Sequence, residues 1–191
     1  MNFIVLDIET SNLNADFGFV ICAVCKEYGI NGKGGIKIFK IDDYREWLDA
    51  RYNDKPLVKD LSEHLNKYDG IVTYNGRNFD IPFLRSQLIS YELPKIKDMF
   101  HIDVYYLTKY KLKLHNNKLN SLIHFLNTYR DKKKKVEEKT YINSLYYRKA
   151  VTGDKSGITE LVRHCTKDVI ALEQCYDCLK SEMRSLSRSF M

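Results

Sequence analysis

The stretch IVLDIET, residues 4–10, sets the pattern from which the rest of the chain can be interpreted. An apolar, β-rich run leads into Asp7-Ile8-Glu9, so we expect a strand over about Asn2 to Ile8. Because side chains alternate along a strand, Asp7 and Glu9 share one face. Two neighbouring carboxylates at the end of a buried strand need a compensating cation, whereas on an exposed strand end both would be solvated.

A second acid follows a similar strand in TYNGRNFDIPFL, residues 73–84. Gly70 to Tyr74 is typical of a short buried strand, and Asn75 to Asn78 is a turn cluster. Helical periodicity then runs from Phe79 to Tyr91, with Asn78 as the expected N-cap. Asp80 therefore lies near a helix N-terminus. A favourable interaction with the helix dipole is one explanation for this acid, and metal binding is another.

The third acidic segment is HCTKDVIAL, residues 164–172, inside a long helix expected from about Ile158 to Leu186. His164 and Asp168 are four residues apart, so they lie on one face of the helix, one turn apart. They are either a surface pair or a metal ligand with a general base beside it.

In this order, DIET, YNGRNFDIPFL and HCTKDV resemble the three exonuclease motifs of the DEDD 3′–5′ exonucleases. The likeness is strongest to the proofreading exonuclease domain of family-B DNA polymerases and its stand-alone relatives, and it extends from about residue 3 to about residue 180. It implies an RNase H-like fold and a two-metal hydrolysis that releases nucleoside 5′-monophosphates from a 3′ end. The implied ligands of two Mg²⁺ or Mn²⁺ ions are Asp7, Glu9, Asp80 and Asp168.

The same resemblance assigns candidate roles to four other residues. His164 occupies the position of the family-B tyrosine and becomes the candidate general base, with a spacing to Asp168 that is unusual for a histidine. A histidine whose pKa is near neutrality can accept a proton directly. Thr10, Asn75 and Phe79 are the candidate substrate-binding residues, with Asn75 matching the asparagine of the second motif.

The remaining elements predict an α/β fold, an RNase H-like mixed sheet of three antiparallel strands plus parallel strands, flanked by α-helices. We expect one domain over residues 1–191, with no linker, repeat or polymerase domain. The further expected strands are Phe19 to Tyr28, Ile36 to Ile41 and Ile102 to Leu107, with a hairpin turn at Asn31 to Gly35. The further expected helices are Asp43 to Lys67, interrupted near Asn53 to Pro56, then Leu119 to Leu126 and Tyr141 to Val151.

Composition indicates the partner class only broadly. The formal net charge is +6 and the sequence pI is about 8.9, which favours an anionic partner such as nucleic acid. No apolar run approaches the ~18 residues of a membrane helix, and the N-terminus lacks a basic signal region, so a cytoplasmic location is expected. The basic run Lys132 to Lys135 is interpreted as a solvated loop in preference to a phosphate-binding one. Tyrosines among basic residues at 105–110 and 141–147 suit stacking on single-stranded bases.

The five cysteines include two C-x-x-C pairs, which can indicate zinc. Cys22 and Cys25 lie in an apolar strand, where positions three apart face opposite ways, and Cys175 and Cys178 lie within a helix. Reduced thiols are therefore expected.

Two classes of function follow from this sequence: an active 3′–5′ exonuclease, and a nucleic-acid-binding module of the same fold that has lost catalysis. Four carboxylates and a candidate base favour the enzyme. The resemblance to proofreading domains favours single-stranded DNA, and an exoribonuclease is the alternative, since sugar preference depends on contacts to the 2′-OH. An endonuclease is a weaker possibility.

Overall fold

A five-stranded mixed sheet forms the centre of the computed structural model, which describes residues 1–29, 32–49 and 52–186. The strand order is β3-β2-β1-β4-β5, with antiparallel pairing among the first three strands and parallel pairing of β4 with β1 and β5. This arrangement confirms the predicted α/β fold. The strands are β1 (Phe3–Thr10), β2 (Val20–Glu27), β3 (Ile36–Lys40), β4 (Gly70–Thr73) and β5 (Phe100–Asp103).

The central strand β1 is only partly paired on one side. Its β2 partner runs along it from Ile4 to Thr10, with a register shift between Glu9 and Thr10. Its β4 partner pairs only over Phe3 to Val5. The second half of β1 therefore extends past β4, and its outer edge is open to groups from the chain that follows β4.

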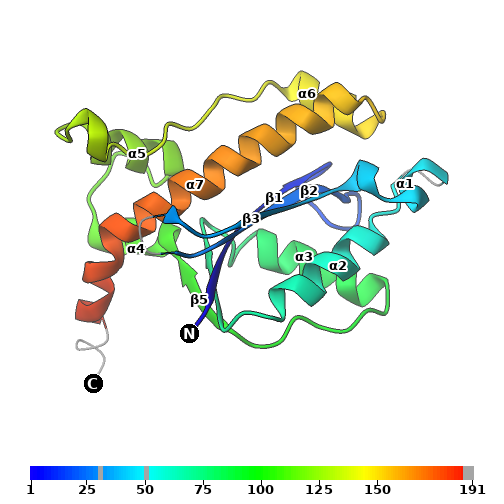
Figure 1. Ribbon diagram of the computed structural model, residues 1–191, viewed down its shortest axis with the longest axis horizontal. Helices are drawn as coiled ribbons and strands as arrows, with labels where there is room; N and C mark the ends of the chain where they lie inside the picture. Colours follow the sequence, from blue (N-terminus) through cyan, green and yellow to red (C-terminus); the bar gives the residue numbers. More distant parts are fainter. Residues whose placement is uncertain (30–31, 50–51, 187–191) are drawn as a thin grey trace.

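Helices cover both faces of the sheet (Figure 1). The long α7 (Lys155–Leu186) lies across one face, and α2 (Lys55–Leu65) and α3 (Asp80–Ser90) lie on the other. The segment 128–143, here called the covering segment, runs above α7 toward α6. The other helical elements are η2 (Ile41–Asp43), α1 (Arg45–Asp49), α4 (Val104–Lys111), α5 (Leu119–Asn127), η3 (Lys132–Lys134) and α6 (Ser144–Val151).

The long helix packs as its apolar spacing predicts. Leu161, Cys165, Val169 and Leu172 are buried at 1% exposure or less and face the sheet. Burying such a stripe is what stabilises an amphipathic helix against a core. All five cysteines are free thiols. Within the described ranges, no helix combines the length and the apolar character that crossing a bilayer requires.

Two local predictions are wrong. The strand expected at Ile102 to Leu107 is instead β5 followed at once by α4, because Asp103 caps the helix by accepting a hydrogen bond from the Tyr105 amide at 3.1 Å. Asn78 is not the N-cap of α3: Phe79 occupies that position, and the Asn78 side chain donates instead to Asn75 Oδ1 at 2.7 Å. The expected turn residue Asn31, and residues 50–51 of the expected helical region, lie outside the described residues.

Candidate active site

The first two candidate ligands lie on the second half of β1, which pairs with β2 but extends past β4. Strand alternation places Ile8 in the core at 4% exposure and turns Asp7 and Glu9 toward α7. The Cys165 thiol of α7 donates to the Asp7 carbonyl oxygen at 3.3 Å, which fixes the helix against this part of the strand. Glu9 is 9% exposed and Asp7 is half-buried, so neither acid of the first motif is freely solvated.

The open edge of β1 explains how Asp80 reaches the site. Its Oδ1 accepts a hydrogen bond from the Ile8 amide at 3.2 Å, and the carboxylate is only 4% exposed. The Ile8 amide would otherwise be an unpaired donor, because β4 stops short of it. As the first residue of α3, Asp80 also lies at the positive end of that helix.

The third motif faces these acids from α7. His164 and Asp168 are each 5% exposed, which rules out a surface pair. The His164 Nε2 lies 3.7 Å from Asp168 Oδ2 and 3.8 Å from Glu9 Oε1. Three segments that are far apart in the sequence therefore bring their predicted residues to one place.

Burial, and after it repulsion between neighbouring carboxylates, makes the charged forms of these acids unfavourable. Burial, followed by repulsion from Asp168, raises the pKa of Asp7 to about 7. Burial and the neighbouring Asp7 raise the pKa of Glu9 to about 8. Burial and Asp7 also raise the pKa of Asp80 well above its ordinary value. Each shift means that the charged form is unfavourable without a further cation.

Two residues, Lys139 of the segment 128–143 and Tyr147 of α6, partly offset this charge. The Lys139 ammonium pairs with Asp168 Oδ2, and the Tyr147 hydroxyl donates to Glu9 Oε2 at 2.5 Å. Burial alone would lower the pKa of Lys139, but the Asp168, Asp7 and Glu9 carboxylates outweigh it and raise that pKa. The single ammonium group of Lys139 thus interacts electrostatically with three carboxylates.

The donor set suits a divalent cation, and one atom in particular has no other partner. Asp168 Oδ1 is buried and accepts no hydrogen bond from any described residue. Carboxylate oxygens are the ligands that Mg²⁺ and Mn²⁺ prefer. Among the described residues, no three acidic, histidine or cysteine side chains form a ready cation site. Lys139 and Tyr147 engage Asp168 and Glu9, so a cation would compete with them for those oxygens.

The other ring nitrogen of His164 has a partner outside the carboxylate cluster. Its Nδ1 lies 3.1 Å from the Thr140 hydroxyl oxygen, again in the covering segment. If Nδ1 carries the proton and donates to Thr140, then Nε2 presents a lone pair toward the carboxylates. Burial lowers the pKa of His164 despite the opposing effect of Asp168, so the ring is neutral at neutral pH.

The three candidate substrate-binding residues are less closely connected to the acids. Thr10 is 8% exposed and its hydroxyl donates to the Asn12 carbonyl at 2.7 Å. Asn75 has a positive φ of 65° and is held by its amide, which donates to Asp103 Oδ1 at 2.7 Å. Phe79 packs beside Phe83, with ring centroids 5.8 Å apart. No interaction joins these three directly to Asp7, Glu9 or Asp168 in the part of the chain described.

The sequence does not single out Lys139, Thr140 or Tyr147 as partners of the acids and of His164. Lys139 stands in VEEKTY, a stretch without periodicity, and Tyr147 is one of several tyrosines between basic residues. A buried carboxylate cluster requires a positive charge nearby, so the sequence could have indicated that a basic residue contacts the acids. It does not say which lysine supplies it.

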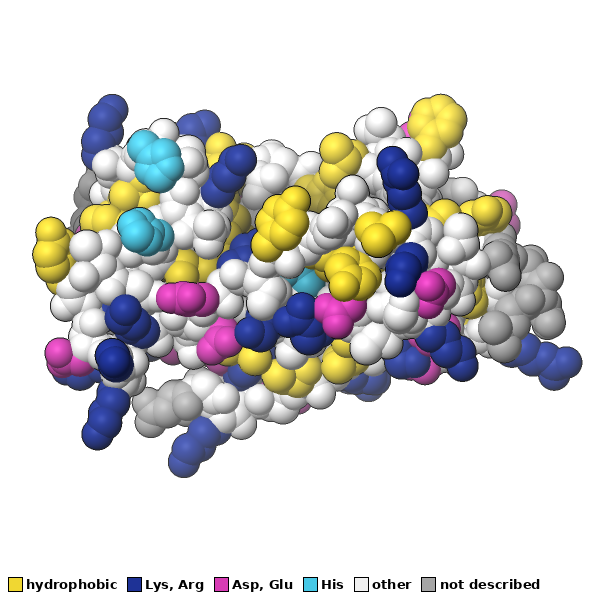
Figure 2. All heavy atoms as spheres, turned by 90° about the horizontal axis from the view of Figure 1, so that it is seen from above, with side chains coloured by type: hydrophobic (Ala, Val, Ile, Leu, Met, Phe, Trp, Pro, Cys, Tyr) yellow, Lys and Arg dark blue, Asp and Glu magenta, His cyan; other side chains and the backbone are white. Residues whose placement is uncertain are grey.

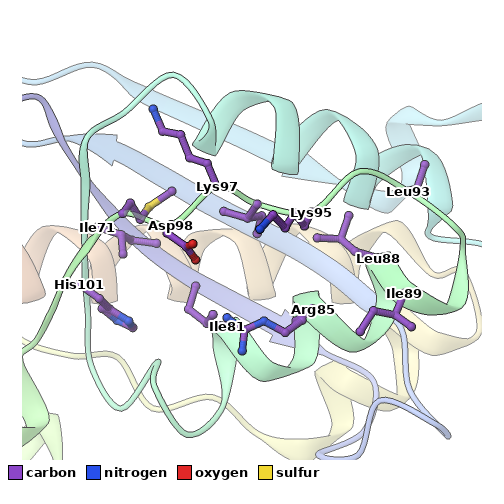
Figure 3. Close-up of a pocket in the computed structure, with 12 residues that line it drawn as sticks. Ile71, Ile81, Arg85, Leu88, Ile89, Leu93, Lys95, Lys97, Asp98 and His101 are labelled. Carbon is purple, nitrogen blue, oxygen red and sulfur yellow. The ribbon is translucent and has the colours of Figure 1, made fainter.

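A separate cavity of about 580 Å³ lies away from this cluster, between α3 and the chain that leads to β5 (Figure 3). Its walls are apolar residues such as Ile81 and Leu88, with Arg85 and Lys95 among them. None of the four carboxylates lines it. The candidate active site is therefore defined by its charged groups rather than by the volume of a pocket.

Comparison with known proteins assigns the family. The family profile RNase_H_2, of the RNase H superfamily, matches residues 4–180. A DNA polymerase of Methanocaldococcus jannaschii is 30% identical over 112 residues, which cover 46% of this chain and 7% of that polymerase.

Among solved structures, the family B DNA polymerase from the hyperthermophilic archaeon Pyrobaculum calidifontis matches with a TM-score of 0.69 and 15% identity, over 94% of this chain and 24% of that one. The chain thus spans less than a quarter of either polymerase. The likeness is to a nuclease-type domain, and because the profile covers nearly the whole described sequence, the chain belongs to the RNase H superfamily.

Proposed function

We propose that this protein is a metal-dependent 3′–5′ exonuclease that hydrolyses single-stranded DNA and releases nucleoside 5′-monophosphates. The observation that carries the proposal is the convergence of Asp7, Glu9, Asp80 and Asp168, with repulsion among them and with Asp168 Oδ1 unpartnered. Such a cluster is costly unless it serves to bind cations.

The four carboxylates would hold two Mg²⁺ or Mn²⁺ ions. When bound, these ions supply activation of the attacking water and stabilisation of the leaving 3′ oxygen. The negative charge of the cluster alone would repel a phosphodiester, so the protein's own acids require this neutralisation before a substrate can approach.

His164 is the proposed general base. Its neutral ring, oriented by Thr140, presents Nε2 at the edge of the carboxylate cluster and can accept the proton of the attacking water. Lys139 is within the same cluster, and its ammonium would face the phosphate once it leaves Asp168. Thr10, Asn75 and Phe79 are the proposed contacts to the terminal nucleotides.

An exoribonuclease with the same residues is the first alternative, and an inactive nucleic-acid-binding module is the second. The paired carboxylates favour an enzyme over a binding module, because a module without catalysis has no use for buried acids with raised pKa values. The likeness to family B DNA polymerases supports DNA as the substrate.

The test is product analysis on 5′-labelled and 3′-labelled single-stranded DNA and RNA, with Mg²⁺, Mn²⁺ or EDTA. We expect 3′-labelled DNA to release labelled mononucleotide at once and 5′-labelled DNA to shorten stepwise, with no reaction in EDTA. Faster cleavage of RNA than of DNA would favour the exoribonuclease.

Asp168→Ala is the matching inactive variant, and Glu160→Gln is its control. Glu160 lies on the same helix but forms a surface pair with Arg163. Loss of cleavage in Asp168→Ala with full cleavage in Glu160→Gln supports the assignment. Undiminished cleavage in Asp168→Ala contradicts it.

A further inference from the structure

A second feature lies at the outer edge of the sheet, beside the turn that leads to Asp80. Here a shallow cavity of about 480 Å³ opens between β5 and α4. β5 is the last strand of the sheet, and two of the lining rings, Phe100 and Tyr110, are 53% and 67% exposed. Large aromatic rings left in solvent beside a hollow are typical of a binding surface.

The aromatic rings of α4 form a continuous row. Tyr106 and Tyr110 lie nearly parallel, with ring centroids 6.0 Å apart and an interplanar angle of 15°. Tyr105 meets Tyr106 edge-on at 5.2 Å. The outer ring, Tyr110, therefore presents a flat face that is supported from behind, which lowers the entropy lost when a planar group stacks on it.

Positive charge is held beside these rings. The Lys109 ammonium lies 5.6 Å from the centre of the Tyr110 ring and 5.9 Å from that of Tyr105. The Arg77 guanidinium donates to the His101 carbonyl of β5 at 2.6 Å, so it is fixed along the cavity wall. Both residues are exposed.

No exposed acid opposes them among the described residues that line the cavity. Asp103 is the one carboxylate there, and it is 5% exposed, with its oxygens occupied by the Asn75 and Arg77 amides at 2.7 and 2.9 Å. Exposed rings with fixed cations and no free acid suit a polyanion that also carries planar groups. Single-stranded nucleic acid has both, whereas an apolar protein surface would leave the cations unpaired.

A hydrogen-bonded chain links this surface to the candidate active site. The Tyr106 hydroxyl donates to Asn78 Oδ1 at 3.1 Å, and Asn78 Nδ2 donates to Asn75 Oδ1 at 2.7 Å. The same turn ends at Asp80, which is one of the four acids. A strand with its 3′ end at the acids can therefore continue across this turn onto α4.

We propose that Arg77, Phe100, Tyr106, Lys109 and Tyr110 form a second subsite, the α4 strip, that binds single-stranded nucleic acid upstream of the 3′ end. Bases stack on Tyr110 and Phe100, and phosphates contact Lys109 and Arg77. Because base stacking and phosphate contacts do not involve the 2′-OH, we expect the strip to bind DNA and RNA alike. The assignment of the strip to the nucleotides upstream of the 3′ end rests on the proposed function, whereas binding of nucleic acid to the strip does not require cleavage.

The test measures binding by fluorescence anisotropy in Ca²⁺ in place of Mg²⁺, so that a cation still neutralises the acids, with oligonucleotides of about four and about sixteen nucleotides that a gel shows to stay intact. Only the longer one can occupy both the acids and the α4 strip. Tyr110→Ala should weaken binding of the longer oligonucleotide by about 5- to 100-fold, the range for losing one stacked base, and leave the shorter one unchanged. Because Tyr110 is mostly exposed, the variant keeps its fold, which a thermal scan checks.

Three matched variants separate stacking from other contacts. Tyr110→Phe keeps the ring and should bind like the unmodified protein, whereas Tyr110→Leu keeps apolar area without a ring and should bind like Tyr110→Ala. Tyr129→Ala removes a 98% exposed tyrosine outside the α4 strip and should have no effect. Lys109→Ala should lower the slope of log affinity against log salt concentration by roughly 0.7, one phosphate contact.

Unchanged binding of the longer oligonucleotide by Tyr110→Ala overturns the proposal, and so does an equal loss for both lengths. If the protein binds through Tyr110 yet cleaves nothing, the α4 strip stands and the proposed catalytic function fails. If the unmodified protein cleaves as expected and Tyr110→Ala binds the longer oligonucleotide normally, the proposed catalytic function stands and the α4 strip fails.

Discussion

At the scale of single residues, the defining property of the site is buried negative charge with too little compensation. Asp7, Glu9 and Asp80 all have raised pKa values, and one ammonium, that of Lys139, faces the cluster. A cation-binding function accounts for this cost.

Removing a charge from the metal-free site should stabilise the protein in a pH-dependent way. The pKa of Asp7 rises from 3.8 to about 7 on folding, so folding favours its protonated form, and stability falls as pH rises through that interval. In EDTA at about pH 8.5, Asp7→Asn should therefore raise the free energy of unfolding by a few kcal/mol, with a smaller gain at about pH 5. Asp16→Asn, an exposed acid, is the control. Equal gains at both pH values would contradict the account.

Removing the imidazole should affect rate but not metal binding. His164→Ala should slow cleavage by about 10²- to 10⁴-fold, the usual range for a general base, with unchanged affinity for Mn²⁺. Because burial lowers the pKa of His164 below 6.5, the rate ratio of unmodified to variant protein should rise with pH only below about pH 6.5 and then level off. A ratio near one at every pH would leave His164 as a packing residue.

Removing the counter-ion should destabilise the metal-free protein and strengthen its response to metal. Lys139→Met leaves Asp168 without its partner, which should cost on the order of 1–3 kcal/mol, less than for a fully buried pair because the lysine side chain is 32% exposed. Added Mg²⁺ should then raise the Tm more than it does for the unmodified protein. Lys135→Met, an exposed lysine of the same segment, should show neither change. A smaller Mg²⁺ response in Lys139→Met would mean that the lysine assists metal binding instead.

At the scale of elements, what the sequence predicts well is what alternation and helical spacing control. The D-x-E pair on β1, the strand–turn–helix that carries Asp80 and the α7 face with His164 and Asp168 all follow from local periodicity. The boundary between β5 and α4 was not predicted. The aromatic and β-branched residues that follow Ile102 favour a strand, whereas the N-cap at Asp103 starts a helix. A single capping side chain outweighs propensity there.

Asp103 has two structural functions at this junction, so its removal should lower the stability of the protein substantially. It caps α4 through the Tyr105 amide and holds the turn after β4 through the Asn75 and Arg77 amides. Asp103→Ala should lower the free energy of unfolding by about 2–4 kcal/mol in urea titrations, because a cap and two further amides lose their acceptor. Asp98→Ala, an exposed acid just before β5, is the control. Equal stability of the two variants would mean that the turn holds without Asp103.

At the scale of the whole molecule, the mixed sheet with flanking helices and the meeting of the three motifs could be predicted, while the lysine and the tyrosine that contact the acids could not. Lys139 contacts Asp168 from 29 residues away and lies in a stretch with no periodicity. Tyr147 contacts Glu9 from 138 residues away and lies on a predicted helix, but nothing in the sequence distinguishes it from the neighbouring tyrosines. The net charge of +6 also says little about position: basic side chains are interspersed with acidic and apolar ones over the face that carries α5 and α6 (Figure 2). Charge alone would not have located either site.

The central claim is that the four acids form a nuclease site that acts at a free 3′ end. The most direct measurement compares linear and circular single-stranded DNA of one sequence, in Mg²⁺ or Mn²⁺, with products resolved to single nucleotides. We expect the linear strand to be degraded to nucleoside 5′-monophosphates from its 3′ end while the circle stays intact, and we expect Asp168→Ala to degrade neither. Equal degradation of circle and linear strand, or cleavage that persists in EDTA, would contradict it.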